Sequence, residues 1–175
     1  MSLHGAYDPD NIFAKILRGD IPAVKVWEDE HVLAFMDVFP QSEGHVLVIS
    51  KTSTARNMLE VEPEALARIT EAVRRLSVAV EKALKPDGIT ISQFNGDAGG
   101  QTIFHLQFHI VPRWADRALK GHGHAPMAEP EALRALADRI AAKLSVGKGP
   151  RNTNHAPAAI SRNPAAWFRV SFSPR

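Results

Sequence analysis

The segment Gln101–Arg113 reads QTIFHLQFHIVPR, and polar and apolar side chains alternate along it. Its polar positions include His105, Gln107 and His109, and each position between these three is apolar. Side chains of a strand point alternately to opposite faces, so we expect a strand here. Its apolar face should lie on the core and its polar face should point to a cleft or to solvent. Roughly 7 Å would separate successive polar groups along the chain.

The flanking segments predict an α+β domain with two main helices. Helical spacing is clearest before Leu84, where one apolar face repeats and Pro63–Glu64 suits a first turn. The resulting β-β-β-α-β-β-α order, preceded by a short helix, favours a mostly antiparallel sheet over a doubly wound one. The expected elements are helices within 11–19, 53–84 and 129–144, two strands within 23–38 separated by a turn at 28–30, and strands at 45–50, 89–95 and 103–113.

Composition is that of an ordinary globular protein of 175 residues. With 21 Lys and Arg against 19 Asp and Glu, the charge is too balanced to indicate nucleic-acid binding. The chain has no cysteine, which excludes disulfides, thiolate zinc sites and a cysteine nucleophile. No apolar run is long enough to cross a membrane, and the first ten residues lack a signal-peptide apolar region. We therefore expect a cytoplasmic protein.

The chain divides into three parts. Residues 1–10 are a polar N-terminal extension, residues 11–144 form the domain, and residues 145–175 are a tail rich in Pro, Ser, Asn and Ala. The tail is expected to be either flexible or docked on a subunit through Trp167–Phe168. An ordered tail without a function is the alternative.

The histidine segment has three interpretations. A glycine loop, AGGQT at 98–102, precedes it, and glycines let backbone N–H groups approach an anion closely. Another imidazole, His45, begins an apolar strand and can face the same place. A solvated strand face with incidental histidines is the second interpretation. A metal site is the third, and we expect none, because rings four residues apart on a strand are widely separated and no carboxylate is near in sequence.

The sequence GGQTIFHLQFHIVPR resembles the signature of the histidine triad (HIT) superfamily, in which three histidines alternate with hydrophobic residues. Upstream, IFAKILRGDIP and VLAFMDVFPQSEGHVLVISK resemble the bacterial Hint-like branch, and the similarity extends over about residues 11–144. The resemblance implies a homodimer that binds a purine nucleotide. Substrates in the family include nucleoside phosphoramidates, aminoacyl adenylates and dinucleoside polyphosphates. The middle histidine attacks the α-phosphate, and water hydrolyses the covalent nucleotidyl-histidine.

The resemblance also implies roles for individual residues. Asp37 would hold the ribose hydroxyls, His109 would bind the phosphate, and His105 and His45 would support and orient the site. Neutral donors around the phosphate would come from Asn95, Gly100, Gln101 and Thr102. No cofactor is implied. Some family members carry a Cys-x-x-Cys zinc site where this chain has Asn11–Ala14, so structural zinc is not expected. His122 and His124 are interpreted from the local sequence as incidental surface histidines of a loop, with adventitious metal binding as the alternative.

The chain departs from the family at the position of the nucleophile, which is Gln107. An amide nitrogen is neither a useful nucleophile nor a base near neutral pH, although the group donates and accepts hydrogen bonds. Loss of a nucleophile typically reduces kcat by on the order of 10⁴ to 10⁶. Three accounts remain: a binding protein with little turnover, direct hydrolysis by a water that Gln107 orients with His105 or His109 carrying the proton, and an engineered substitution. A protein-interaction module with an unused cleft is a further alternative.

Overall fold

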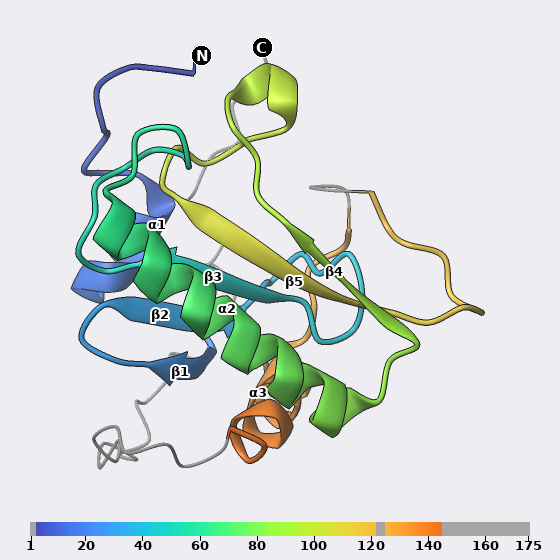
Figure 1. Ribbon diagram of the computed structural model, residues 1–175. Coiled ribbons are helices and arrows are strands. Elements are labelled where there is room, and N and C mark those ends of the chain that lie inside the picture. Colours follow the sequence, from blue (N-terminus) through green and yellow to red (C-terminus); the bar gives the residue numbers. More distant parts are fainter. Residues whose placement is uncertain (1–2, 122–124, 145–175) are drawn as a thin grey trace.

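The computed structural model describes residues 3–121 and 125–144 of the chain (Figure 1). The predicted histidine pair at 122 and 124 and the predicted tail at 145–175 lie outside these residues. Within them the elements follow the predicted order, and none of their helices is long and apolar enough to cross a membrane. The elements are α1 (Ile12–Arg18), β1 (Lys25–Glu28), β2 (Val32–Met36), β3 (Val46–Ser50), α2 (Pro63–Leu84), β4 (Gly88–Ser92), the short 3-10 helix η1 (Asp97–Gly99), β5 (Gln107–Arg113) and α3 (Pro130–Ala141).

The five strands form one sheet in the order β1-β2-β3-β5-β4, and every neighbouring pair is antiparallel. Hairpins join β1 to β2 and β2 to β3. The pairing of β3 with β5 is different, because α2 and β4 lie between these two strands in sequence. The predicted α+β class with an antiparallel sheet is confirmed.

Local sequence signals set the helix ends. Asn11 begins α1, and its side-chain oxygen accepts hydrogen bonds from the backbone nitrogens of Phe13 and Ala14, both at 3.0 Å. Gly19 ends this helix with a φ of 84°, a left-handed conformation that glycine adopts without strain. Pro63 opens α2, where its missing N–H costs no helical hydrogen bond. The predicted first turn is therefore confirmed.

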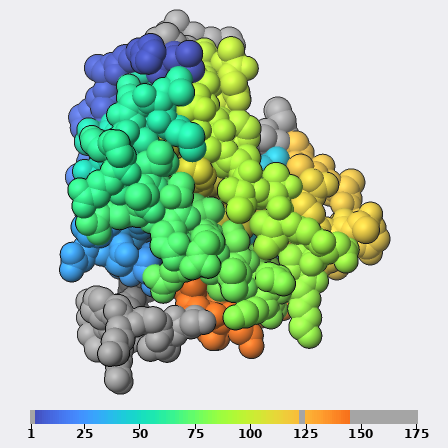
Figure 2. Space-filling model, in the orientation of Figure 1, coloured from blue at the N-terminus to red at the C-terminus, as the bar shows by residue number. Residues whose placement is uncertain are grey.

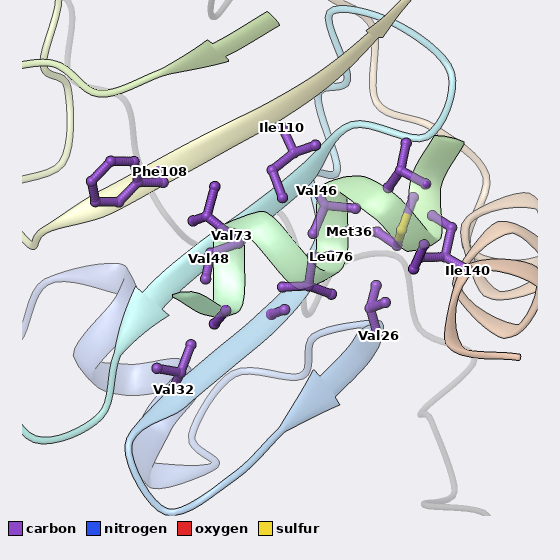
Figure 3. Packing of buried hydrophobic residues seen from close by; sticks show 14 of the residues in the cluster. Val26, Val32, Met36, Val46, Val48, Val73, Leu76, Phe108, Ile110 and Ile140 are labelled. Atoms are coloured by element: carbon purple, nitrogen blue, oxygen red, sulfur yellow. The ribbon is translucent and has the colours of Figure 1, made fainter. Parts of the chain in front are cut away.

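The main core lies between the sheet and the long helix α2, which runs across one face of the sheet (Figure 1). Figure 3 shows valine and methionine side chains of β2 and β3 meeting Val73 and Leu76 of α2, with Ile140 of α3 at one end. In the orientation of Figure 1, the space-filling view shows α2 and the segment before it lying over the sheet (Figure 2). This face of the sheet is therefore filled with apolar side chains.

A smaller core lies on the other face of the sheet. It consists of Phe13 from α1 together with Leu33, Phe35, Leu47 and Ile49 from β2 and β3. In the β3–β5 pairing, Leu47 is opposite His109 and Ile49 is opposite Gln107. Residues directly opposite one another share a face, so the polar positions of β5 lie on the face that carries α1.

The strand prediction for 103–113 is wrong at its beginning, because β5 starts only at Gln107. The neighbouring strand β3 ends at Ser50, and Ile49 opposite Gln107 is the last pair that the two strands form. Upstream of it, the backbone nitrogen of Leu106 donates to the carbonyl of Ala55 at 2.9 Å instead. His105 therefore precedes the strand, and only Gln107 and His109 share a strand face.

Candidate functional site

Three polar side chains from separate segments meet beside β5. Asp37 follows β2, His45 precedes β3, and His109 lies within β5. Nδ1 of His45 is 3.2 Å from Oδ2 of Asp37, and Nε2 of His45 is 3.0 Å from Nδ1 of His109. Both imidazoles are at most 2% exposed. The result is a carboxylate–imidazole–imidazole chain with both imidazoles buried and the carboxylate partly exposed.

The carboxylate decides which nitrogen of His45 carries the proton. Nδ1 of His45 lies near Asp37 but also 3.3 Å from the backbone nitrogen of Gln41. A backbone N–H only donates and a carboxylate only accepts, so one proton state of Nδ1 satisfies just one of them. The bond to the charged acceptor is the stronger, and we assign the proton to Nδ1. Nε2 then accepts from Nδ1–H of His109, which places the lone pair of neutral His109 on its Nε2.

His105 lies apart from this chain and is 1% exposed. Its Nε2 is 3.0 Å from the carbonyl oxygen of Ser50, and its Nδ1 is 2.7 Å from the hydroxyl of Tyr7. The ring of Phe13 meets it edge to face, with centroids 6.0 Å apart. Burial lowers the pKa of His105, and the hydrogen bond to Ser50 offsets part of that effect. The imidazole is therefore neutral near pH 7, and both of its nitrogens are engaged.

Gln107 is also buried, at 4% exposure, although the sequence suggested a face toward a cleft or solvent. Its Oε1 makes no hydrogen bond with any residue that the structure describes. Leaving a buried acceptor without a donor costs about 1–3 kcal/mol. A buried acceptor in this state, between two histidines, leaves room for a donor from a water or a ligand.

The glycine loop uses its amides internally. The backbone nitrogens of Gly99 and Gln101 donate to Gly96, and that of Gly100 donates to Asp97. The side chain of Gln101, 3% exposed, accepts from the nitrogen of Gly96 and donates to the carbonyls of Arg56 and Ile103. Gln101 therefore holds the loop closed.

Two further predicted donors border this loop. Asn95 is half-buried, and its Oδ1 accepts from the backbone nitrogen of Met58 at 3.0 Å. Thr102 is exposed. Neither is linked by a described hydrogen bond to the histidine chain, so their roles toward a phosphate stay predictions.

The trio of Asp37, His45 and His109 is also a possible metal site, since one ligand atom from each lies within 4.8 Å of the others. The sequence argument against metal concerned a different pair, His105 and His109, and it missed this trio because its members are far apart in sequence. A metal ion would have to displace the proton shared by the two imidazoles. The expectation of no metal stays a prediction.

A cavity of about 390 Å³ lies elsewhere, between the start of the sheet and α2. Trp27, stacked by the guanidinium of Arg75 at 5.1 Å, forms part of its wall. Its rim carries exposed ion pairs such as Glu64–Arg68. It includes none of the predicted site residues, and exposed pairs of this kind contribute little binding energy.

Sequence reasoning missed two aromatic residues at the site. Tyr7 belongs to the expected N-terminal extension, and Phe94 meets the ring of His109 edge to face at 5.4 Å. Nothing in the local pattern marks Phe94. Tyr7 is the only tyrosine in the chain, but a single polar aromatic near a terminus carries no chemical signal by itself.

Comparisons with known proteins identify the family of the chain. The HIT domain model matches residues 18–116. Protein hit of Bacillus subtilis is 39% identical over 141 residues, covering 77% of this chain and 94% of that protein. An adenosine 5'-monophosphoramidase of Schizosaccharomyces pombe is 38% identical over 134 residues, covering 76% and 97%. The crystal structure of a Hit-like protein from Bartonella henselae matches with a TM-score of 0.75 and 45% identity, covering 80% and 100%. The chain therefore belongs to the HIT domain family.

Proposed function

We propose that this chain binds a purine nucleotide beside β5 and has a nucleotide hydrolase-type site whose covalent step is weak or absent. The family relationship supports nucleotide binding, since one relative is named as an adenosine 5'-monophosphoramidase. The observation that carries it is the buried amide of Gln107, whose Oε1 lacks a donor among the described residues. Rotation of the amide exchanges its ends, so it can present its NH₂ group to a phosphate.

The roles of the surrounding groups follow from their contacts. His109 faces the phosphate with Nε2, the nitrogen that does not face His45, and it must be protonated there to donate to a phosphate oxygen. Asp37 accepts from the ribose hydroxyls in addition to its bonds with His45 and the backbone nitrogen of Phe39. Asn95, Gly100 and Thr102 flank the phosphate, whereas Gln101 acts indirectly. To reach a ligand, its side-chain amide would have to give up hydrogen bonds to two backbone carbonyls. Both carbonyls would then lose a donor, and a single new bond to phosphate replaces only one of the two.

Turnover by the family's covalent route is limited because Gln107 occupies the nucleophile position. The amide nitrogen cannot attack phosphorus, since its lone pair is delocalised into the carbonyl. Direct hydrolysis by water would need a proton carrier near position 107. His105 is unsuited to that role, because it is neutral and bonded at both nitrogens. Only His109, linked to Asp37 through His45, fits it.

Nucleotide binding is tested by thermal denaturation with AMP or GMP. A ligand at 100 times its Kd stabilises the folded state by about 2.7 kcal/mol, and the melting temperature should rise accordingly. Adenosine is the matched control for the phosphate. No rise with either nucleotide, at concentrations up to several millimolar, would contradict the proposal and favour an interaction module with an unused site.

Catalysis is tested by Gln107→His with an adenosine phosphoramidate as substrate. Restoring an imidazole at this position should raise kcat by several orders of magnitude. Gln93→His, a matched Gln-to-His change at a half-buried position outside β5, should leave turnover unchanged. Equal turnover by the unmodified chain and Gln107→His would show that position 107 does not supply the nucleophile.

A homodimer through β4 is part of this proposal. Of the two edge strands, β1 is short and its register shifts between Lys25 and Trp27, which disfavours further pairing. The outer edge of β4 is regular, and Ile91 on it is 50% exposed. Antiparallel pairing of β4 with a second copy would cover it. Ile91→Lys should then reduce the mass measured by light scattering from dimer to monomer, and an unchanged mass would exclude this interface.

A further inference from the structure

The N-terminal segment, residues 3–10, packs against the site although the sequence suggested a separate extension. In Figures 1 and 2 it lies along the segment that follows β3. The carbonyl of Leu3 accepts from the side chain of Asn57 at 2.7 Å. Near its other end, the carbonyl of Asp8 accepts from the backbone nitrogen of Asn11 at 3.2 Å. Both ends of the segment are thus anchored, with Tyr7 between them.

The close fit of this segment is visible at Gly5. A Cβ atom added there would lie 2.8 Å from a guanidinium nitrogen of Arg56, so a larger residue would force one of them to move. Arg56 in turn stacks over the ring of Phe104, at 4.6 Å from its centroid. The segment is therefore linked to Phe104 through Arg56. It contacts the next residue, His105, directly through Tyr7.

The contacts of His105 determine its tautomer. The carbonyl of Ser50 can only accept, so the nitrogen 3.0 Å from it, Nε2, carries the proton. A neutral imidazole has only one N–H, which leaves Nδ1 as an acceptor. The group 2.7 Å from Nδ1 is the hydroxyl of Tyr7, which must therefore donate. Each of the three groups is satisfied in one proton arrangement only.

We propose that Tyr7 is a positioning residue of this site: its hydroxyl donates to Nδ1, which stabilises the neutral Nε2–H form of His105 that the carbonyl of Ser50 selects, and it fixes the chain just before β5. His105 is the last residue held by a side-chain hydrogen bond before Gln107, and the bond from Leu106 to Ala55 lies between them. A shift of His105 would therefore be passed on to position 107. The mechanistic consequence rests on the proposed function, whereas the effect of Tyr7 on the protonation of His105 does not.

Removing the hydroxyl should release His105. In Tyr7→Phe the ring of residue 7 remains, but Nδ1 of His105 loses its donor. A hydrogen bond to the neutral form disfavours protonation, so its loss makes protonation easier. Burial alone still opposes the charged form. The pKa of His105 should consequently rise toward its ordinary value, while the carbonyl of Ser50 still keeps the proton of the neutral ring on Nε2.

Nitrogen-15 NMR of the imidazoles tests this inference on the full chain without nucleotide. The unmodified protein should show His105 as a single neutral tautomer protonated at Nε2 near pH 7. Tyr7→Phe should keep the Nε2-protonated neutral form, because Ser50 remains, but His105 should titrate at a higher pH. Leu3→Ala, which alters an exposed side chain of the same segment, should retain the spectrum of the unmodified protein. An identical His105 spectrum and titration in Tyr7→Phe would overturn the proposal.

A second measurement addresses catalysis in the Gln107→His background. Adding Tyr7→Phe should lower kcat by on the order of 10-fold or more and change KM little, because small misplacements of reacting groups cost up to about 10²-fold. It should also move the acid limb of the pH profile upward. Leu3→Ala in the same background should change neither. An unchanged kcat and profile for Tyr7→Phe would refute the positioning role, whereas inactivity of Gln107→His itself would refute the proposed function and leave the NMR result standing.

Discussion

His105 should make the protein lose stability in mild acid. Burial lowers the pKa of its imidazole below the ordinary value of 6.5. The unfolded chain therefore binds a proton at this residue at a higher pH than the folded protein does. The stabilisation that comes from keeping His105 neutral in the folded state is fully present well above pH 6.5. It is lost as the pH falls from there toward the lowered pKa of the folded state.

The magnitude follows from proton linkage at one site. Where only the unfolded state is protonated, each pH unit removes about 1.4 kcal/mol from the free energy of unfolding. Half of the unfolded molecules are already protonated at the ordinary pKa of 6.5. Integration between pH 6.5 and 5.5 therefore gives a loss of about 1 kcal/mol if the folded imidazole stays neutral over that range.

Urea denaturation of the protein and of His105→Gln at pH 7.5, 6.5 and 5.5 measures the pH-dependent contribution of His105 to the free energy of unfolding. A glutamine at 105 can still donate to the carbonyl of Ser50 but does not titrate. Other titrating groups are common to both proteins, so they cancel in the difference between the two free energies of unfolding. That difference should become smaller by about 1 kcal/mol between pH 6.5 and 5.5. A difference that does not change with pH would refute the assignment of His105 as a buried neutral group.

Three further changes test other parts of the structure. Gln101→Ala removes the partner of three backbone groups in the glycine loop and should cost about 2–3 kcal/mol, lowering the melting temperature by about 5–10 °C in calorimetry. Gly44→Ala should destabilise more than Gly19→Ala in urea titrations: both have positive φ, but only at Gly44 would the new Cβ lie 2.2 Å from a methyl group of Leu84. Asp37→Asn should weaken AMP binding about tenfold by calorimetry, and unchanged binding would exclude the ribose role.

Sequence periodicity was sufficient for most of the fold. The alternation in β5 and the helical face of α2 are local properties, and both were recovered. The beginning of β5 was not, because it depends on where another strand ends. Ser50 terminates β3, and no local feature of residues 103–106 indicates that their hydrogen-bonding partners stop there.

The same distinction applies to the site. The family pattern named Asp37, His45, His105 and His109, and the structure joins three of them in a hydrogen-bonded chain. The burial of the three histidines was not foreseen, because alternation assigns a residue to a face but does not say what covers that face. The cover includes α1 and the N-terminal segment, which reach the site only through tertiary packing. Tyr7 was missed for that reason.

The pairing of β3 with β5 has a kinetic consequence. The hydrogen bond between His45 and His109 joins residues 64 positions apart, with the whole of α2 inside the loop that it closes. Loop-closure entropy must be lost before such a contact forms, although the loss grows only slowly with loop length. Formation of α2 shortens the effective loop. The imidazoles of His45 and His109 should therefore come together late in folding, and recovery of nucleotide binding during refolding should report completion of the fold rather than its initiation.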